Sequence, residues 1–130
     1  MKIPCEIIVW YVLPIIRSEF ANELVVGYGM TQAKVARRFG VTDAAISQYL
    51  KKKRGDSSAI EHMDAFPLLL DEIKESARRV VEEDADFDLE LCRLCGAVKT
   101  TGLLGEITSY LTGHELVECY SMGGPFSFTE

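Results

Sequence analysis

Four cysteines are the residues of this chain best suited to metal binding or redox chemistry: Cys5, Cys92, Cys95 and Cys119. Cys92 and Cys95 form a Cys-x-x-Cys pair, which in a cytosolic chain indicates metal or thiol redox chemistry before structural disulfides. With His114 and Cys119 the pair makes a set spaced by 2, 18 and 4 residues, close to common structural zinc spacings. If no metal is bound, either Cys92 and Cys95 act as a redox-active dithiol, or all four cysteines are unreactive, partly buried thiols.

A second group of residues has the side chains that proteins use to read DNA: Thr42, Asp43, Ala44, Ala45, Ser47 and Gln48. Gln48 can pair with adenine through two hydrogen bonds, Ser47 can bond to several bases, and Ala44 or Ala45 can meet a thymine methyl group. Asp43 either accepts a hydrogen bond from cytosine or favours the N-terminus of its helix.

Residues beside this group can bind the DNA backbone. Gln32 can fix a phosphate, and the basic run that follows can bind several: Lys51, Lys52, Lys53 and Arg54. Such contacts set affinity and salt dependence without specifying sequence.

A helix-turn-helix over residues 31–54 would position all of these side chains. The pattern predicts one helix over 31–39 capped by Thr31, a turn at Gly40, and a second helix from Thr42 to about Lys53. Ala36 is small enough for two helices to cross closely, and the shared core would come from Val35, Phe39, Val41, Ile46 and Tyr49 or Leu50. The alternatives are an ordinary helical hairpin with a charged face, or a helix-turn-helix used only for protein contact.

The charge distribution favours the DNA-binding interpretation. The whole chain has a net charge of −6, but residues 28–55 hold seven basic residues and one acidic residue, a net +6. Residues 56–130 hold five basic and sixteen acidic residues, a net −11. Because phosphate attraction depends on the local patch, we expect the acidic part to face away from DNA or toward a partner.

The run from Met1 to Arg17 and the run from Gly29 to Gly55 resemble a family of prokaryotic, mainly archaeal, transcriptional regulators with a phage-repressor-like (Xre-like) helix-turn-helix. The resemblance is close over residues 3–55 and looser over 89–104, and its most specific parts are Pro-Cys-Glu at 4–6 and Ser-Gln-Tyr-Leu at 47–50. It implies a DNA-binding regulator.

The resemblance also implies an iron–sulfur cluster, because Cys5, Cys92 and Cys95 match three of the family's cysteine positions. The family's further cysteine lies about ten residues past the Cys-x-x-Cys, where this chain has Gly105. Cys119 is the remaining thiol, and its position is not the family's. A four-thiolate cluster, a three-thiolate cluster, zinc and no metal therefore all stay open.

The rest of the chain is predicted to be helical, so that the fold class is all-α. The expected helical segments are 5–26 with a kink or split at Pro14, 58–83 with a break at Pro67, and 102–111 ending at Gly113, with a linker at 54–58. We expect a DNA-binding domain over 1–56 and, over 57–130, a helical region for dimerisation and for metal or redox sensing.

An apolar stripe recurs at intervals of 3, 4, 3, 4 and 3 residues: Met63, Phe66, Leu70, Ile73, Ala77 and Val80. It either packs on the chain's own core or pairs with a second copy, and it is the best candidate for a homodimer seam.

The remaining expectations concern compartment and class. The apolar stretch from Ile7 to Ile16 lacks a basic leader and is too short to span a bilayer, so we expect a cytoplasmic protein without membrane association. We expect no enzymatic activity. The rival functions are a thiol-redox enzyme using Cys92 and Cys95, and an antitoxin-like adaptor that binds a protein partner.

Overall fold

The computed structural model describes residues 4–51 and 56–113 of the 130-residue chain. Every regular element in those two ranges is helical, and they contain no strand. The predicted all-α fold class is therefore confirmed for the described part of the chain.

The N-terminal segment forms one long helical spine with two wider, π-helical turns in it. It runs through α1 (Pro4–Ile7), the π-helical η1 (Ile8–Val12), α2 (Leu13–Asn22) and the π-helical η2 (Glu23–Gly27). Pro14 is the second residue of α2, which begins directly after η1. Since proline lacks an N–H group and clashes with the preceding turn, a local change of helix type at this point is expected.

Two short capped helices follow: α3 (Gln32–Phe39) and α4 (Asp43–Leu50). The Thr31 hydroxyl accepts a hydrogen bond from the backbone N–H of Lys34, and the Thr42 hydroxyl accepts one from that of Ala45, both at 3.1 Å. Gly40 ends α3 with φ at 72°, a left-handed conformation that glycine adopts without strain. The predicted caps and turn of this helix pair are confirmed.

The predicted end of the second helix is wrong. The helix ends at Leu50, and Lys51 is already extended, with φ at −81° and ψ at 133°. The hydroxyl of Ser18 on α2 donates a hydrogen bond to the backbone carbonyl of Tyr49, so a partner distant in sequence takes up one of the last carbonyls of α4. Lys52, Lys53 and Arg54 lie outside the described residues.

Three longer helices and one short helix make up the rest: α5 (Asp56–Glu61), α6 (Phe66–Glu83), α7 (Phe87–Thr100) and α8 (Leu103–Thr112). The predicted linker over 54–58 is wrong from Asp56 onward, because α5 begins there; aspartate and serine favour helix N-termini. The predicted break at Pro67 is confirmed, since α6 begins at Phe66 with the proline in its first turn. Gly113 ends α8 as expected.

The apolar stripe, which lies on α6 except for Met63 just before it, faces the core of this chain. Phe66, Ile73, Ala77 and Val80 are all less than 5% exposed, and Met63 and Leu70 pack partly buried against the same core. The stripe as a seam for a second copy is therefore wrong, because the chain's own α2 and α7 already cover that face.

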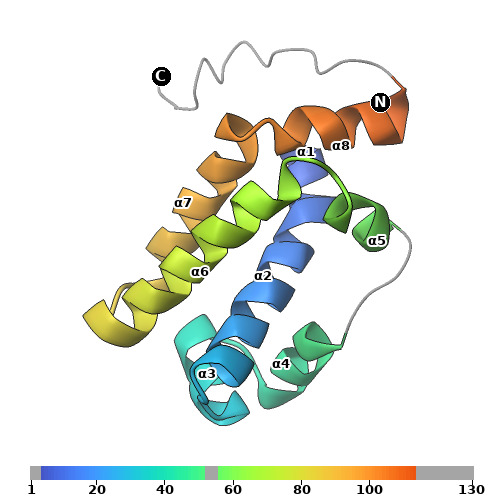
Figure 1. Ribbon diagram of the computed structural model, residues 1–130. Helices are drawn as coiled ribbons and strands as arrows, with labels where there is room; N and C mark the ends of the chain where they lie inside the picture. Colours follow the sequence, from blue (N-terminus) through green and yellow to red (C-terminus); the bar gives the residue numbers. More distant parts are fainter. Residues whose placement is uncertain (1–3, 52–55, 114–130) are drawn as a thin grey trace.

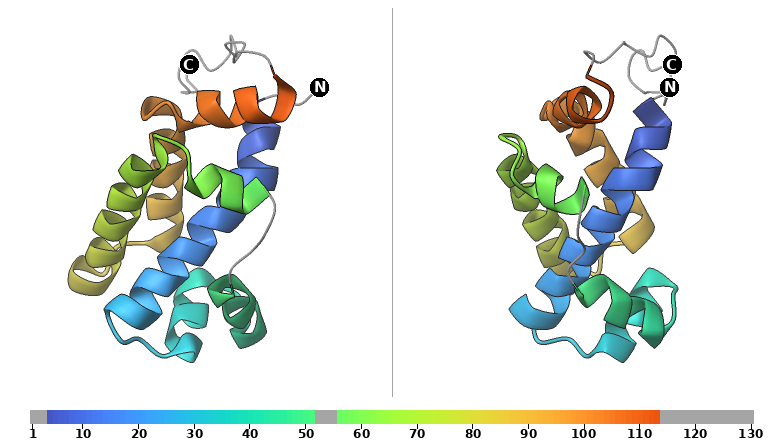
Figure 2. Two further views of the ribbon diagram at one scale, coloured as in Figure 1. Left: turned by 45° about the vertical axis from the view of Figure 1, so that its right-hand side comes forward. Right: turned by 90° about the vertical axis from the view of Figure 1, so that its right-hand side faces the viewer.

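The helices are arranged around the N-terminal spine, as Figures 1 and 2 show from three directions. The α3–α4 pair lies at one end of the molecule and α8 at the opposite end, with α6 and α7 side by side along the spine. Buried residues from Ile7 to Ile107 form one hydrophobic cluster that crosses the expected boundary at residue 56. In the described ranges, no helix is long and apolar enough to cross a membrane.

Candidate nucleic-acid interface and cysteine pair

The α3–α4 pair is held on the spine by a small set of buried side chains. Val35, Ala36 and Phe39 of α3 and Ile46 of α4 are buried, and they meet Phe20 and Leu24 of the spine in the shared core. Ala36 is 2% exposed, and its carbonyl accepts a hydrogen bond from the N–H of Val41 across the turn. With these residues inside, the opposite faces of both helices remain in solvent.

The outward face of α4 carries most of the side chains that the sequence assigns to base contacts. Thr42, Asp43, Ala44, Ser47 and Gln48 are exposed, while Ala45 is half-buried. Gln32, at the start of α3, is also exposed, and the Ser47 hydroxyl donates a hydrogen bond to its side-chain oxygen at 3.3 Å. The fold therefore brings Gln32 next to the polar face of α4, and Ala45 contributes least to that face.

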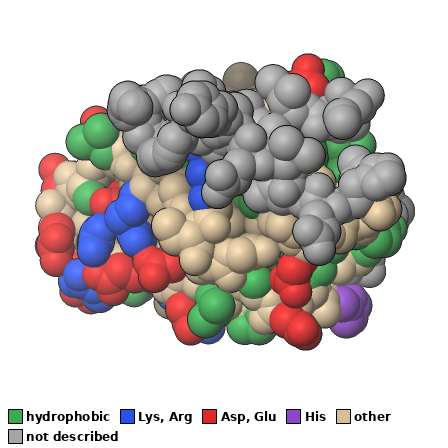
Figure 3. Space-filling model, turned by 90° about the horizontal axis from the view of Figure 1, so that it is seen from above, with side chains coloured by type: hydrophobic (Ala, Val, Ile, Leu, Met, Phe, Trp, Pro, Cys, Tyr) green, Lys and Arg blue, Asp and Glu red, His purple; other side chains and the backbone are tan. Residues whose placement is uncertain are grey.

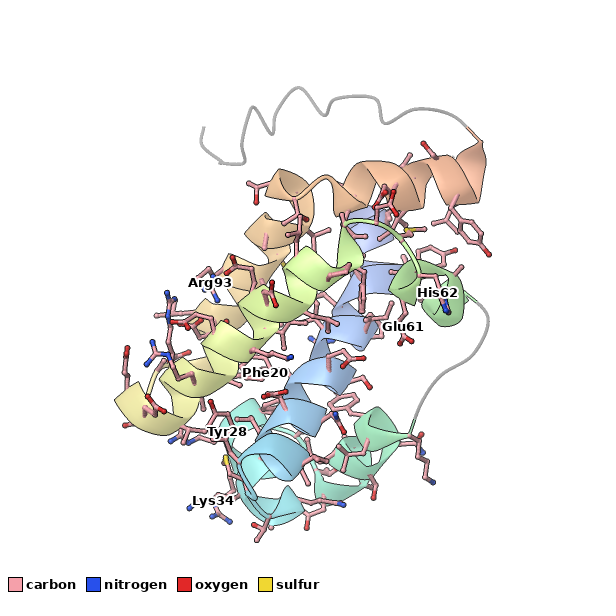
Figure 4. All side chains as sticks on the ribbon, viewed as in Figure 1. Phe20, Tyr28, Lys34, Glu61, His62 and Arg93 are labelled. Carbon is pink, nitrogen blue, oxygen red and sulfur yellow. The ribbon has the colours of Figure 1, made fainter. Side chains whose placement is uncertain are left out.

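Positive charge at this end comes from α3 as well as from the segment after α4. Lys51 is exposed, and so are Lys34, Arg37 and Arg38 on α3. The side chain of Lys34 points away from the bundle at the end formed by α3 and α4 (Figure 4). The three α3 cations are part of the net +6 of residues 28–55, but the sequence motif did not identify them as site residues. Their spacing, i, i+3 and i+4, would have placed them on one helix face.

An aromatic cluster joins this end of the molecule to the helix that carries the cysteine pair. The rings of Phe39, the last residue of α3, and Phe87, the first residue of α7, stack with centroids 3.9 Å apart. Phe20 of α2 packs against both rings, at 5.5 Å from Phe39 and 5.1 Å from Phe87. A displacement of the start of α7 would therefore press directly on α3.

The cysteine pair lies in the middle of α7. Cys92 is exposed and Cys95, one turn later, is half-buried. Burial, together with the neighbouring Cys92 thiol, raises the pKa of Cys95 above its ordinary value of 9.0, and the positive charges of Lys99 and Arg17 offset part of that effect. A raised pKa leaves little of the Cys95 thiol ionised at neutral pH.

The described residues supply at most half of a four-ligand metal site. In them, no three or more His, Cys, Asp or Glu side chains are grouped as metal ligands would be. The backbone of Cys5 lies in α1, which packs on α8, but its side chain lies outside the described atoms, as do His114 and Cys119. Cys92 and Cys95, three residues apart on one helix face, fit the role of two thiolate ligands.

An ionic network covers the side of the molecule formed by α6 and α7, where Figure 3 shows basic side chains among acidic ones. Arg93 of α7 reaches across to α6, where it donates to the carbonyl of Glu72 at 3.0 Å and to the hydroxyl of Ser76 at 2.7 Å (Figure 4). It also bonds to the carboxylate of Glu90 at 3.1 Å.

Two carboxyl groups of this network have lowered pKa values. Burial alone would raise the pKa of Glu90, but hydrogen bonds from Ser76 and Arg93 and the charges of Arg93 and Arg79 outweigh it, so its pKa lies below 4.5. Hydrogen bonds from Arg78, assisted by Arg79, lower the pKa of Glu75 to about 2.

These shifts predict acid sensitivity. A carboxyl group whose pKa is lowered by folding stabilises the fold above its unfolded-state pKa and loses that contribution as pH falls through its folded-state pKa. We therefore expect the free energy of unfolding to fall as pH drops from about 4.5 toward about 2, and not between about 7 and about 5 on account of these two groups. Urea titrations at several pH values across this range measure the free energy of unfolding. In Glu90→Gln, that free energy should fall less steeply as the pH drops. If the free energy of unfolding of that variant falls with pH as steeply as that of the unmodified chain, Glu90 does not contribute to the acid sensitivity.

No protein-family model, curated protein or solved structure matches this chain.

Proposed function

We propose that this chain is a sequence-specific DNA-binding transcriptional regulator that reads the major groove with α4. The observation that carries the proposal is the exposed polar face of α4, with Ser47 and Gln48 directed outward from a helix whose other side is anchored by Ile46 and Ser18. Two short helices joined by a left-handed glycine are a common way of presenting a helix to DNA. The resemblance to phage-repressor-like regulators points to the same function.

The proposed contacts divide into base reading and backbone binding. Gln48 and Ser47 read base edges, Ala44 approaches a thymine methyl group, and Asp43 lies at the start of the helix where it accepts from cytosine. Lys51 and the α3 cations bind phosphates together with the basic run at 52–54. Gln32, which accepts the hydrogen bond from Ser47, positions that hydroxyl and binds a phosphate through its amide nitrogen.

A homodimer on a palindromic operator is part of the proposal. Two recognition helices about one helical turn of DNA apart would read two half-sites. Because the α6 stripe is buried, the dimer surface must lie elsewhere. Sedimentation of the free protein and of its DNA complex measures the stoichiometry, and protection of a single asymmetric half-site would contradict a dimer.

Two single substitutions test the division into base contacts and phosphate contacts. Gln48→Ala should lower discrimination at one base position by about 1–3 kcal/mol, because it removes a bidentate base contact.

Lys51→Ala should weaken binding to all sequences alike and reduce the salt dependence by about one phosphate contact. Operator selection from a random library, followed by affinity measurements at several salt concentrations, gives both quantities.

The matched control is Lys74→Ala, which removes one exposed cation from the middle of α6, outside the α3–α4 pair. It should leave affinity and salt dependence close to those of the unmodified chain. Unchanged base preference in Gln48→Ala would remove Gln48 from the reading face. Sequence-independent binding by the unmodified chain would overturn the proposal as a whole.

We further propose that the cysteines make this regulator responsive to metal or redox state. A bound cluster or zinc ion would link α7 to other parts of the chain. The stacking of Phe87 on Phe39 connects α7 to the α3–α4 pair. Metal analysis of anaerobically purified protein, with operator affinity before and after chelation, tests this. Metal-free protein whose affinity does not depend on thiol oxidation would refute it.

The rival functions have less support. A thiol oxidoreductase needs an easily ionised cysteine, and Cys95 has a raised pKa at a mid-helix position where the helix dipole gives no help. An antitoxin-like adaptor would use the acidic surface of α6 and α7, but much of that charge is paired with Arg78, Arg79 and Arg93 within the chain.

A further inference from the structure

The turn between α6 and α7 lies beside α3, at the end of the molecule that carries the proposed DNA-binding face (Figure 1). We use the name acidic turn for this turn together with the helix ends that flank it, whose exposed acidic residues are Glu82, Glu83, Asp84, Asp86 and Asp88. Asp84 reaches α3, where its carboxylate accepts a hydrogen bond from the guanidinium of Arg38 at 2.7 Å. The carboxylate of Asp84 is therefore bound to one of the α3 cations that we propose as phosphate-binding residues.

The contact is open to exchange. The side chain of Asp84 is 87% exposed and that of Arg38 is 35% exposed, so water and ions reach both groups. Ion pairs of this kind contribute little to folding. A DNA phosphate that approaches α3 would compete for the same guanidinium, and its negative charge would also be repelled by the rest of the turn.

The other carboxylates of the turn have different tasks. Glu82 and Glu83 are paired with Arg78 on α6, and the carboxylate of Asp86 caps α7 by accepting hydrogen bonds from the N–H groups of Asp88 and Leu89. Asp84 ends α6 with φ at 56°, the one left-handed residue other than glycine in the described ranges. That conformation turns the chain at the point where its carboxylate meets α3.

Arg37 and Arg38 share one open hollow with Asp84, Asp86 and Asp88. Arg38 and Lys34 are one helical turn apart on the same face of α3, and Lys34 points away from the bundle at this end (Figure 4). The acidic turn thus lies along one edge of a cationic helix face, where it lowers the local positive potential.

We propose that Asp84 is an intramolecular competitor for Arg38, so that the α6–α7 turn limits the affinity of this chain for DNA. This inference rests on the proposed function. It makes Arg38 a phosphate-binding residue that is engaged by Asp84 in the free protein, and it makes Asp84 a determinant of affinity without any contact to DNA. Because a phosphate contact carries no base information, the effect is the same for every DNA sequence.

The test is Asp84→Asn, measured by fluorescence anisotropy with the full chain on its selected operator and on an unrelated duplex. Asparagine tolerates the left-handed conformation as aspartate does, so the turn keeps its backbone. We expect about three- to fivefold tighter binding to both duplexes, and a gain that shrinks as salt screens the charges. Asp71→Asn is the matched control: it removes the same charge from an exposed position on α6, about 20 Å along the helix, and should change affinity less than about twofold.

A double substitution separates competition for Arg38 from general charge repulsion. In an Arg38→Ala background, Asp84→Asn should lose most of its gain, because the contested cation is absent. If Asp84→Asn and Asp71→Asn have the same affinity, or if the gain persists without Arg38, the competitor role is overturned while DNA binding stands. If the unmodified chain binds no duplex, the proposed function fails and this inference fails with it.

Discussion

Replacing Phe20 by alanine should lower the free energy of unfolding by about 3–5 kcal/mol, the largest effect that we expect of a single substitution in this chain. Phe20 is fully buried, and its ring packs against both Phe39 of α3 and Phe87 of α7, which stack on each other. Alanine would leave a cavity where the spine, the α3–α4 pair and the α6–α7 pair meet. The loss therefore combines lost burial with unfilled space.

Urea denaturation followed by circular dichroism measures this loss. The matched control is Leu89→Ala, which removes an apolar side chain that is 68% exposed on α7 and should change stability by less than about 0.5 kcal/mol. Since one hydrophobic cluster extends from Ile7 to Ile107, both proteins should unfold in a single transition. Two separated transitions, with Phe20→Ala shifting only the first, would show that the helices after residue 56 are stable without the spine.

Replacing Arg93 by methionine should lower the free energy of unfolding by about 2–3 kcal/mol at neutral pH. Methionine keeps an unbranched stem but removes the guanidinium that joins α7 to Glu72 and Ser76 of α6. It also leaves the carboxylate of Glu90, whose side chain is only 10% exposed, with Ser76 and the more distant Arg79. The cost of a poorly compensated buried charge makes this loss larger than that of a surface ion pair.

The size of the loss should depend on pH. Because Glu90 without Arg93 is more easily protonated, the difference between the variant and the unmodified chain should shrink as pH falls below the ordinary carboxyl pKa of 4.5. Arg93→Met combined with Glu90→Gln should recover part of the loss, since no buried carboxylate then remains unpaired. Arg78→Met is the control, because its partners Glu75, Glu82 and Glu83 are near the surface, where solvent screens the charges. Equal losses for Arg93→Met and Arg78→Met would contradict a special role for Arg93.

The helix pair that carries the candidate interface could be predicted because its signals are local. Thr31 and Thr42 cap helices by bonding to N–H groups three residues away, and Gly40 supplies the one conformation that the turn requires. The alternation of buried and exposed positions in α3 likewise follows from the helical period. Such features need no knowledge of the rest of the fold.

The end of α4 could not be predicted in the same way. Nothing between Leu50 and Lys53 is a helix breaker, and the basic run is compatible with a longer helix. The helix ends where Ser18, which is 31 residues earlier, bonds to the carbonyl of Tyr49. The packing partner of the α6 stripe could not be predicted either. Apolar residues at intervals of 3 and 4 identify a buried helix face, but not the element that covers it.

The amino-acid pattern alone was enough to predict the all-α class of the described residues, the two ends of α3, the start of α4, and the polar side chains that share one face of α4. Three features depend on how distant helices pack: the burial of the α6 face inside the chain, the bonds from Arg93 of α7 to α6, and the contact of Asp84 with Arg38 across 46 residues. The physical reason is the range of the interactions. Caps and helical periods act over three or four residues, whereas burial partners and ion pairs depend on how distant helices are placed.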